Sequence, residues 1–190
     1  ESDRKQNIIN KTLYLIVEKG FNSVSIADIA KATGLGPGQI YRCFQDKNDI
    51  FKQTILYIAE KRANYFKKID HDLAYKAREI SHGYSEDLTE IEMQLVCEMF
   101  KIDEHHALFE YVKYSEKILK NNGINLISMK YPNASADEIN AFAEIVATFT
   151  EGVLLRKTNG FSQGVNLQIL ENMFLTCLTA LDQQLRDNCI

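Results

Sequence analysis

The segment from Ser25 to Asp46 limits the fold of this chain more than any other feature of the sequence. Its letters, SIADIAKATGLGPGQIYRCFQD, have the pattern of two short helices that pack across a tight turn. Ala30 is small enough for the helices to approach closely, Gly34 permits the positive φ of the turn, and Ile40 anchors the second helix on the first. The pattern predicts a helix-turn-helix, whose second helix can enter the major groove of DNA.

Helical patterns continue through the rest of the chain, and no segment alternates apolar and polar residues over the length of a strand. Ser25 with Asp28 resembles a capping box, and Pro37 suits the first turn of a helix. Besides the two short helices, the sequence predicts helices over about 3–19, 46–68, 71–82, 87–102, 104–130, 136–158 and 165–186, with a break or kink at 121–123.

The charged residues are distributed unevenly. The net charge is −4, yet residues 1–69 contain 12 Lys and Arg against 7 Asp and Glu, whereas residues 70–190 contain 10 against 19. A basic amino-terminal third on an acidic chain favours a surface that faces phosphate groups and a body with another role. A fluctuation of solvated surface charge is the alternative.

Other classes of protein are disfavoured by the motifs. The sequence has no Walker A, G-x-S-x-G, H-E-x-x-H or Rossmann glycine pattern, so we expect no enzyme and no cofactor. The four cysteines form no C-x-x-C pair, and the adjacent His105 and His106 would point in different directions on a helix, so we expect no metal site. We find no apolar run of about 20 residues and no signal peptide, which favours a cytoplasmic protein.

The helix-turn-helix and its flanks resemble the amino-terminal signature of the TetR-type transcriptional regulators. The agreement covers about residues 4–52 without a gap. The matching residues are Gly20-Phe21, Ser25-Ile26-Ala27-Asp28-Ile29-Ala30, Gly34-Leu35 and Ile40-Tyr41-Arg42-Cys43-Phe44-Gln45-Asp46-Lys47-Asn48-Asp49-Ile50. Two positions depart from the family pattern, since Gly36 replaces a common Ser or Thr and Cys43 replaces a common Tyr or His. Because glycine caps a helix less well than serine, we expect the second short helix to be weakened in the absence of DNA.

This resemblance implies an all-α fold, with a helix-turn-helix DNA-binding domain at residues 1–50 and a ligand-binding and dimerisation domain at residues 70–190. A helix over about 47–68 links the two. It also implies a homodimeric, ligand-responsive repressor that binds a palindromic DNA operator and is released by a small-molecule effector. The alternative is a helical interaction protein of the same fold whose main partner is another protein.

Six residues are the expected DNA contacts: Ser25, Gly38, Gln39, Tyr41, Arg42 and Lys47. Ser25 and the amides after it can meet a phosphate at a helix start, and Lys47 stands in the first turn of a helix, where a cation is unfavourable unless a phosphate lies opposite. Gln39 and Arg42 are the candidates for base edges. Tyr41 is the candidate for a phosphate, and Gly38 permits close approach to the groove. Two alternatives stay open: Arg42 contacts only a phosphate, and Tyr41 is partly a core residue.

The last two predicted helices carry apolar stripes that are wider than one neighbouring helix requires. Two such helices that meet their symmetry mates form a four-helix interface, so we expect a homodimer. The expected interface residues are Ile139, Phe142, Val146, Phe149, Val153, Leu170, Phe174, Cys177 and Leu181. The alternative is that both stripes serve only the core of one chain.

Aromatic and acidic residues between 71 and 130 are the candidates for an effector pocket. They include Tyr75, Met93, Phe100, Phe109, Tyr114 and Glu116. Aromatic rings beside a carboxylate suit a cationic, planar ligand. The same residues also suit a core with a solvated acidic face, and the sequence does not identify the effector.

Overall fold

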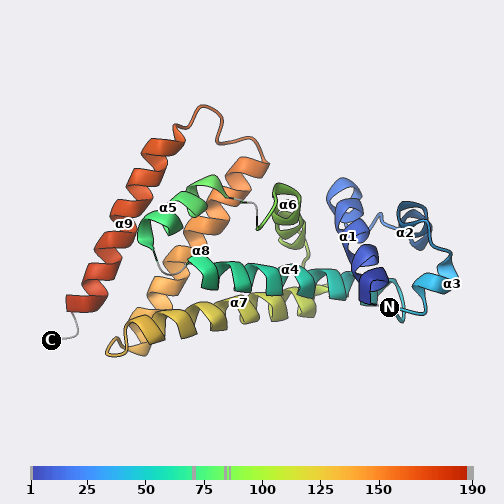
Figure 1. The fold of residues 1–190 in the computed structure, drawn as a ribbon, viewed down its shortest axis with the longest axis horizontal. Coiled ribbons are helices and arrows are strands. Elements are labelled where there is room, and N and C mark those ends of the chain that lie inside the picture. Colours follow the sequence, from blue (N-terminus) through green and yellow to red (C-terminus); the bar gives the residue numbers. More distant parts are fainter. Residues whose placement is uncertain (1, 70–71, 84, 86, 188–190) are drawn as a thin grey trace. The chain divides into compact units, whose positions relative to one another are not determined.

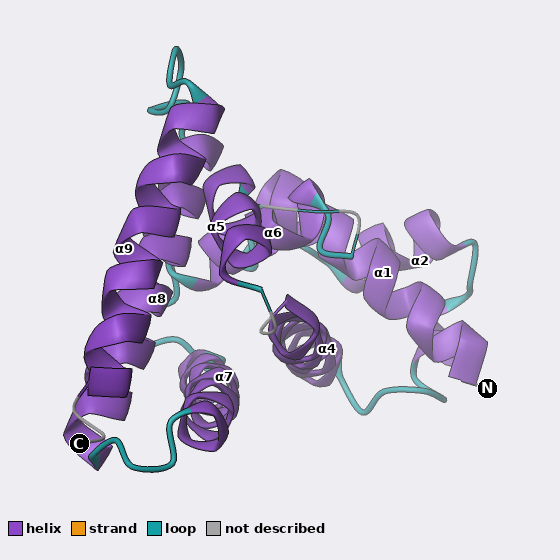
Figure 2. Cartoon of the chain, turned by 60° about the vertical axis from the view of Figure 1, so that its left-hand side comes forward, coloured by secondary structure: helices purple, strands orange, loops and turns teal. Residues whose placement is uncertain are grey.

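A computed structural model gives the structure of the chain and describes residues 2–69, 72–83, 85 and 87–187. These residues form helices and connecting turns, with no strand among them (Figures 1 and 2). The helices are α1 (Ser2–Lys19), α2 (Ile26–Thr33), α3 (Pro37–Ile40), α4 (Lys47–Ile69), α5 (Leu73–His82), α6 (Glu90–Met99), α7 (Phe109–Lys130), α8 (Ala136–Thr158) and α9 (Leu167–Asp187). The predicted all-α fold is confirmed. None of the helices in this described part is long and apolar enough to span a membrane.

Local signals set the ends of several helices. Ser25 caps the start of α2, and Ser135 forms the same kind of capping box with Glu138 at the start of α8. Gly34 follows α2 with a φ of 70°, in the left-handed region where a side chain would be strained. The turn of the helix-turn-helix is therefore formed as the sequence predicts.

The predicted helices differ most from the structure between α6 and α7. Turns occupy residues 100–108, where the Asp103 side chain accepts the backbone N–H of His105 at 3.0 Å. Of the break or kink predicted at 121–123, the break is wrong, because α7 runs through these residues without interruption. Within the helix the Asn122 side chain donates to the Ile118 carbonyl at 2.9 Å, and well-formed turns on both sides favour continuation. The first residue of the predicted helix 71–82 lies outside the described residues.

The chain forms two compact units. Unit 1 comprises Glu1–Glu60 and Gln94–Glu116, and unit 2 comprises Lys61–Met93 and Lys117–Ile190. The core of unit 1 includes the fully buried Ile8, Ile16, Ile29, Ile40, Ile50, Ile55 and Leu108. Residues 94–116 thus pack with the helix-turn-helix residues, although the sequence suggests that they belong to the body.

Candidate nucleic-acid interface

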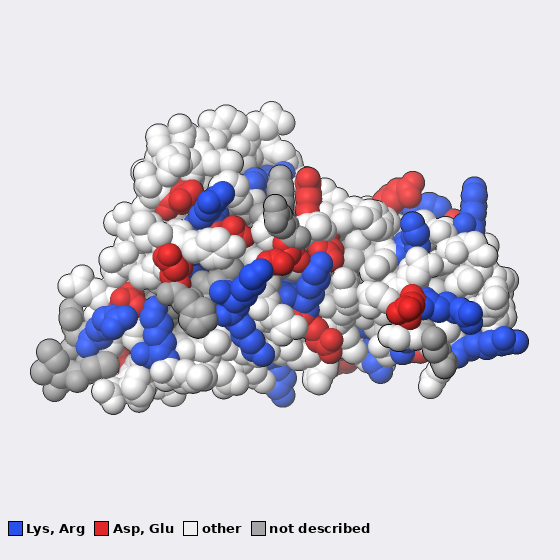
Figure 3. Space-filling model, in the orientation of Figure 1, with Lys and Arg blue, Asp and Glu red and all other residues white. Residues whose placement is uncertain are grey.

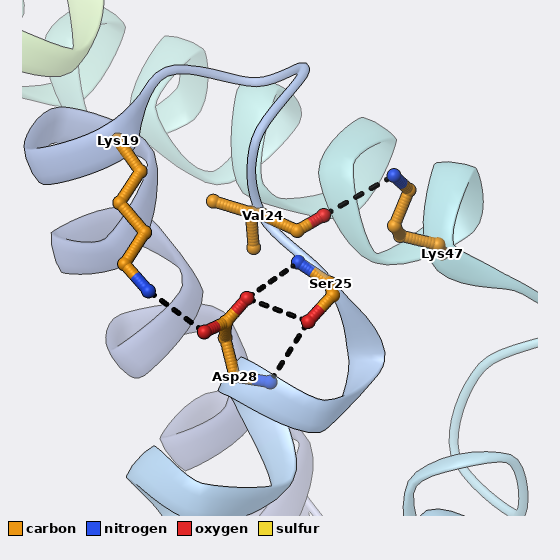
Figure 4. A network of polar contacts seen from close by, with 5 residues as sticks. All are labelled: Lys19, Val24, Ser25, Asp28 and Lys47. Atoms are coloured by element: carbon orange, nitrogen blue, oxygen red, sulfur yellow. Dashed lines mark hydrogen bonds and ion pairs between the residues drawn. The ribbon is translucent and has the colours of Figure 1, made fainter.

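Polar contacts around the Asp28 carboxylate hold the start of α2 in place (Figure 4). The Ser25 hydroxyl accepts a hydrogen bond from the backbone N–H of Asp28 at 3.1 Å and donates to the Asp28 carboxylate at 2.6 Å. This carboxylate also accepts the Ser25 backbone N–H at 2.9 Å and the Lys19 ammonium at 2.7 Å. The Lys19 hydrogen bond, followed by those from Ser25, holds the pKa of Asp28 well below its usual range. Because the cap engages the Ser25 hydroxyl proton, an anion at this end of α2 would meet backbone N–H groups of the first turn.

Lys47 lies beside this helix start although it is the first residue of α4 (Figure 4). Its ammonium donates to the backbone carbonyl of Val24 at 3.1 Å and lies 5.4 Å from the centre of the Phe51 ring. Both contacts offset the unfavourable position of a cation at the amino-terminal end of a helix. An ammonium has three N–H donors, and the Val24 carbonyl takes one. The structure therefore brings the start of α2 and Lys47 together.

The short helix α3 is anchored by buried apolar residues, since Ile40 is 0% and Phe44 2% exposed. Gly36 has no side chain with which to cap it. Gln39 compensates, because its side-chain oxygen accepts the backbone N–H of Gly36 at 2.9 Å. The Gln39 oxygen has a second lone pair and its NH2 group has two donors, so both can meet the edge of a base while the cap on Gly36 is kept.

Gly38, Tyr41 and Arg42 lie at the surface of unit 1, on α3 and the turn after it. Tyr41 is 49% exposed, so it is not a core residue. A Cβ atom added at Gly38 would meet no protein atom within 4 Å. The packing of the chain therefore does not require glycine at position 38, and a need for it would come from a bound partner.

Lys and Arg side chains are spread over the part of unit 1 that carries α1–α3 (Figure 3). Arg4 and Lys31 are exposed there, and the ammonium of Lys5 lies 5.3 Å from the centre of the Phe44 ring. The position of Lys5 beside the turn after α3 was not predicted, because a lysine in the first turns of α1 carries no sequence signal for that contact.

The predicted interface residues all belong to unit 2, on α8 and α9. Ile139 and Phe142 are 8% and 5% exposed in a core cluster with residues of α7 and α9, so packing within one chain already covers most of their surface. The rings of Phe149 and Phe174 pack on each other with centres 5.1 Å apart, beside a second cluster that includes α5. Val146, Val153 and Leu181 are half-buried against these clusters. The stripes are wide because α5, α7, α8 and α9 use them to pack on one another.

Another face of α9 is exposed and apolar. Ile169 and Met173 are 54% and 63% exposed, and Cys177 one turn later is also exposed. Positions four residues apart lie on one face of a helix, so these three form a stripe. Of the residues predicted for the interface, Cys177 belongs to this stripe, and Leu170 is half-buried beside it.

The residues predicted for an effector pocket are divided between the units. Tyr75 and Met93 belong to unit 2, whereas Phe100, Phe109, Tyr114 and Glu116 belong to unit 1. Tyr75, Phe100 and Tyr114 are 40%, 39% and 55% exposed. A cavity of about 210 Å³ in unit 2 is lined by Gly83, Glu90, Met93, Leu154, Lys157 and Thr158. Met93 is the one member of the predicted set in this lining.

Comparison with known proteins supports the assignment made from the motif residues. Residues 8–54 match the family model described as "Bacterial regulatory proteins, tetR family". The HTH-type transcriptional regulator AcrR of Shigella flexneri is 32% identical over 102 residues, which are 51% of this chain and 47% of AcrR. The aligned parts cover between 26% and 58% of the first curated relatives. The predicted resemblance to TetR-type regulators is confirmed.

Two solved structures extend the similarity to nearly the whole chain. Salmonella enterica GusR has a TM-score of 0.75 at 20% identity, and the match covers 95% of this chain and 96% of GusR. The Bacillus subtilis transcriptional regulator FadR, solved in complex with stearoyl-CoA, has a TM-score of 0.64 at 20% identity and covers 91% and 96%. At such low identity these matches show that the fold is shared.

Proposed function

We propose that this chain, whose amino-terminal part is a TetR-type helix-turn-helix domain, is a DNA-binding transcriptional regulator that acts as a homodimeric, ligand-responsive repressor. The observation that carries the proposal is the placement of Lys47 at the capped start of α2, next to an α3 whose outer residues are exposed. We assign DNA binding to residues 1–50, and ligand binding and dimerisation to residues 70–190.

Lys47 and the first turn of α2 form the phosphate anchor in this proposal. The ammonium and the helix amides are hydrogen-bond donors that both attract a negatively charged group such as phosphate. The Val24 carbonyl holds the ammonium next to the helix start. Ser25 acts as the cap that orients the amides, so its role is indirect. Contacts of this kind fix the register of a protein on DNA without reading its sequence.

Base recognition falls to Gln39 and Arg42, which are exposed on α3 and just after it. Arginine pairs with guanine through two hydrogen bonds, and glutamine donates to adenine or guanine through its NH2 group. Each well-placed base contact contributes about 1–3 kcal/mol of discrimination. Tyr41 donates its hydroxyl to a phosphate, and Gly38 allows the backbone of α3 to approach the groove.

The homodimer forms through the exposed stripe of α9 that includes Ile169, Met173 and Cys177. These side chains leave apolar surface in water that a second copy can cover about a two-fold axis. A two-fold dimer presents two copies of α3 to successive major grooves, so the operator is a palindrome with half-sites about one helical turn, or ~34 Å, apart.

The effector binds in unit 2, where the cavity of about 210 Å³ combines the apolar Met93 and Leu154 with the charged Glu90 and Lys157. The dimer can hold its two DNA-binding domains at a spacing that fits the operator or at one that does not. A ligand that binds the second state more tightly lowers operator affinity, by an amount set by the difference between its affinities for the two states. The cavity suits a small molecule with both apolar and polar groups.

Selection from a random DNA library by the purified protein tests this function. The selection is run at about 50 and about 200 mM salt, because contacts with phosphates weaken steeply over this range. Recovery of a palindrome with half-sites one turn apart is the expected result. Recovery of no sequence above background at either salt concentration would contradict the proposal and favour a protein partner, which co-purification with the same tagged protein would then identify.

A further inference from the structure

Within unit 1, residues 94–116 lie beside the turn between α1 and α2 and beside α4. The His106 ring bonds to the Asn22 side chain at 3.0 Å, and the Lys52 ammonium lies 5.0 Å from the centre of the Tyr111 ring. The Glu98 carboxylate lies 3.9 Å from the position that a Cβ atom on Gly20 would occupy. Two of these contacts reach the turn between α1 and α2, and none belongs to the DNA-facing residues of α3.

The tautomer of His106 follows from its two hydrogen bonds. The backbone N–H of Leu108 donates to Nδ1 at 3.1 Å, so this nitrogen is the acceptor. The proton is therefore on Nε2, which donates to the Asn22 side-chain oxygen. The loop itself is held by Asp103, whose backbone carbonyl accepts the His106 N–H at 3.1 Å. The ring is thus oriented by its own loop before it reaches Asn22.

Asn22 lies two residues before Val24, whose carbonyl holds the Lys47 ammonium, and three residues before Ser25, the cap of α2. The segment between them is short, and the Val24 side chain is 1% exposed. The buried Val24 holds one end of this turn, and the His106 hydrogen bond to Asn22 restrains the other end, next to the carbonyl and the cap that determine where Lys47 and the first turn of α2 meet.

We propose that His106 is a positioning residue that holds the Lys47 phosphate anchor in place through Asn22. This inference rests on the proposed function, because it concerns the geometry of the same DNA contacts. His106 lies on the loop between α6 and α7, and both helices continue along the chain into residues of unit 2.

Operator binding by four variants of the full chain tests the proposal. His106→Ala removes the donor, His106→Gln restores an N–H donor near Nε2, and Asn22→Ala removes the acceptor. His105→Ala is the matched control, because His105 is adjacent and 86% of its side chain is exposed. The readouts are the dissociation constant for the selected operator by fluorescence anisotropy, its dependence on salt, and the melting temperature.

We expect His106→Ala and Asn22→Ala to weaken operator binding by about threefold to tenfold, the range for loss of one hydrogen bond. Both should also lower the slope of log affinity against log salt, by about 0.9 for each lost phosphate contact. His106→Gln should recover most of the affinity and the slope, and His105→Ala should match the wild type.

Unchanged affinity and slope in His106→Ala, in a protein whose wild type binds the operator, would overturn the inference and leave the proposed function standing. A loss of affinity with an unchanged slope would also overturn it, since it would indicate a general effect on folding. If His106→Ala does not fold, Asn22→Ala decides between the same outcomes, because it leaves the 94–116 segment intact. A wild type that binds no DNA would instead contradict the proposed function.

Discussion

Replacing Lys47 by methionine removes a positive charge from the start of α2 and keeps an unbranched side chain next to the Phe51 ring. The variant loses the hydrogen bond to the Val24 carbonyl, which contributes about 0.5–1.5 kcal/mol. It also removes a cation from the first turn of α4, where the helix dipole disfavours it by about 0.3–1 kcal/mol. The variant also loses the contact of the ammonium with the Phe51 ring, about 0.5–1 kcal/mol, so we expect the free energy of unfolding to fall by about 1 kcal/mol in total.

DNA binding by Lys47→Met should change far more, and the change should depend on salt. Loss of one phosphate contact in each protomer of a dimer lowers the slope of log affinity against log salt by about 1.8, since each contact contributes about 0.9. Over a fourfold increase, from about 50 to about 200 mM, this slope difference amounts to about a factor of ten. The ratio of wild-type to variant affinity should therefore be about tenfold larger at the lower salt concentration.

Fluorescence anisotropy with the labelled operator at four salt concentrations measures this slope, and chemical unfolding measures stability. Lys120→Met is the matched control, because it makes the same change of charge on the exposed surface of α7, where Lys120 lies 3.9 Å from Glu144. Its slope should equal that of the wild type. Parallel salt dependences for Lys47→Met and the wild type would refute the phosphate-anchor reasoning, whatever the difference in affinity.

Three further outcomes follow from individual side chains. Gly38→Ala should keep or slightly raise the melting temperature, because its Cβ meets no protein atom, but should weaken operator binding in a gel-shift assay by obstructing approach to the groove. Asp28→Asn should destabilise the protein at pH 7, because the lowered pKa of Asp28 means that its carboxylate stabilises the fold above the unfolded-state pKa of about 3.9. The effect of the substitution should shrink as the pH falls below about 3.9, and urea unfolding at pH 7 and well below this pKa checks the sign. Met173→Asp should give folded monomers in sedimentation, whereas Phe142→Asp should unfold the protein because it buries a charge; an intact dimer in Met173→Asp would remove the proposed α9 interface.

The sequence by itself determined the features that depend on neighbours three or four residues away. The capping box of Ser25 and Asp28, the left-handed Gly34 and the apolar anchor at Ile40 are all local, and all lie where the pattern predicts them. The bounds of α8 were also predicted correctly, since its start and end lie between clear turn signals. Local hydrogen bonds and backbone preferences place the ends of these helices, and packing of residues such as Ile40 stabilises them.

The tertiary structure alone decided which surfaces meet. The stripes of α8 and α9 predict an interface, and within the chain Phe142 is buried against α7 and α9 while Phe149 and Phe174 are half-buried beside α5. An apolar stripe shows that one face of a helix is covered. The spacing of its apolar residues is the same whether the covering helix belongs to the same chain or to a second copy. The sequence therefore could not distinguish the core of one chain from a dimer interface.

The same limit applies to the proposed DNA-binding site. The pattern identified Ser25 and Lys47 separately, but the Val24 carbonyl that joins them is a backbone atom with no sequence signature. His106 and Asn22 are 84 positions apart in the chain, and they meet because residues 94–116 fold into the same unit as the turn between α1 and α2. Contacts between distant residues depend on how whole helices pack, and no periodicity within one helix contains that information.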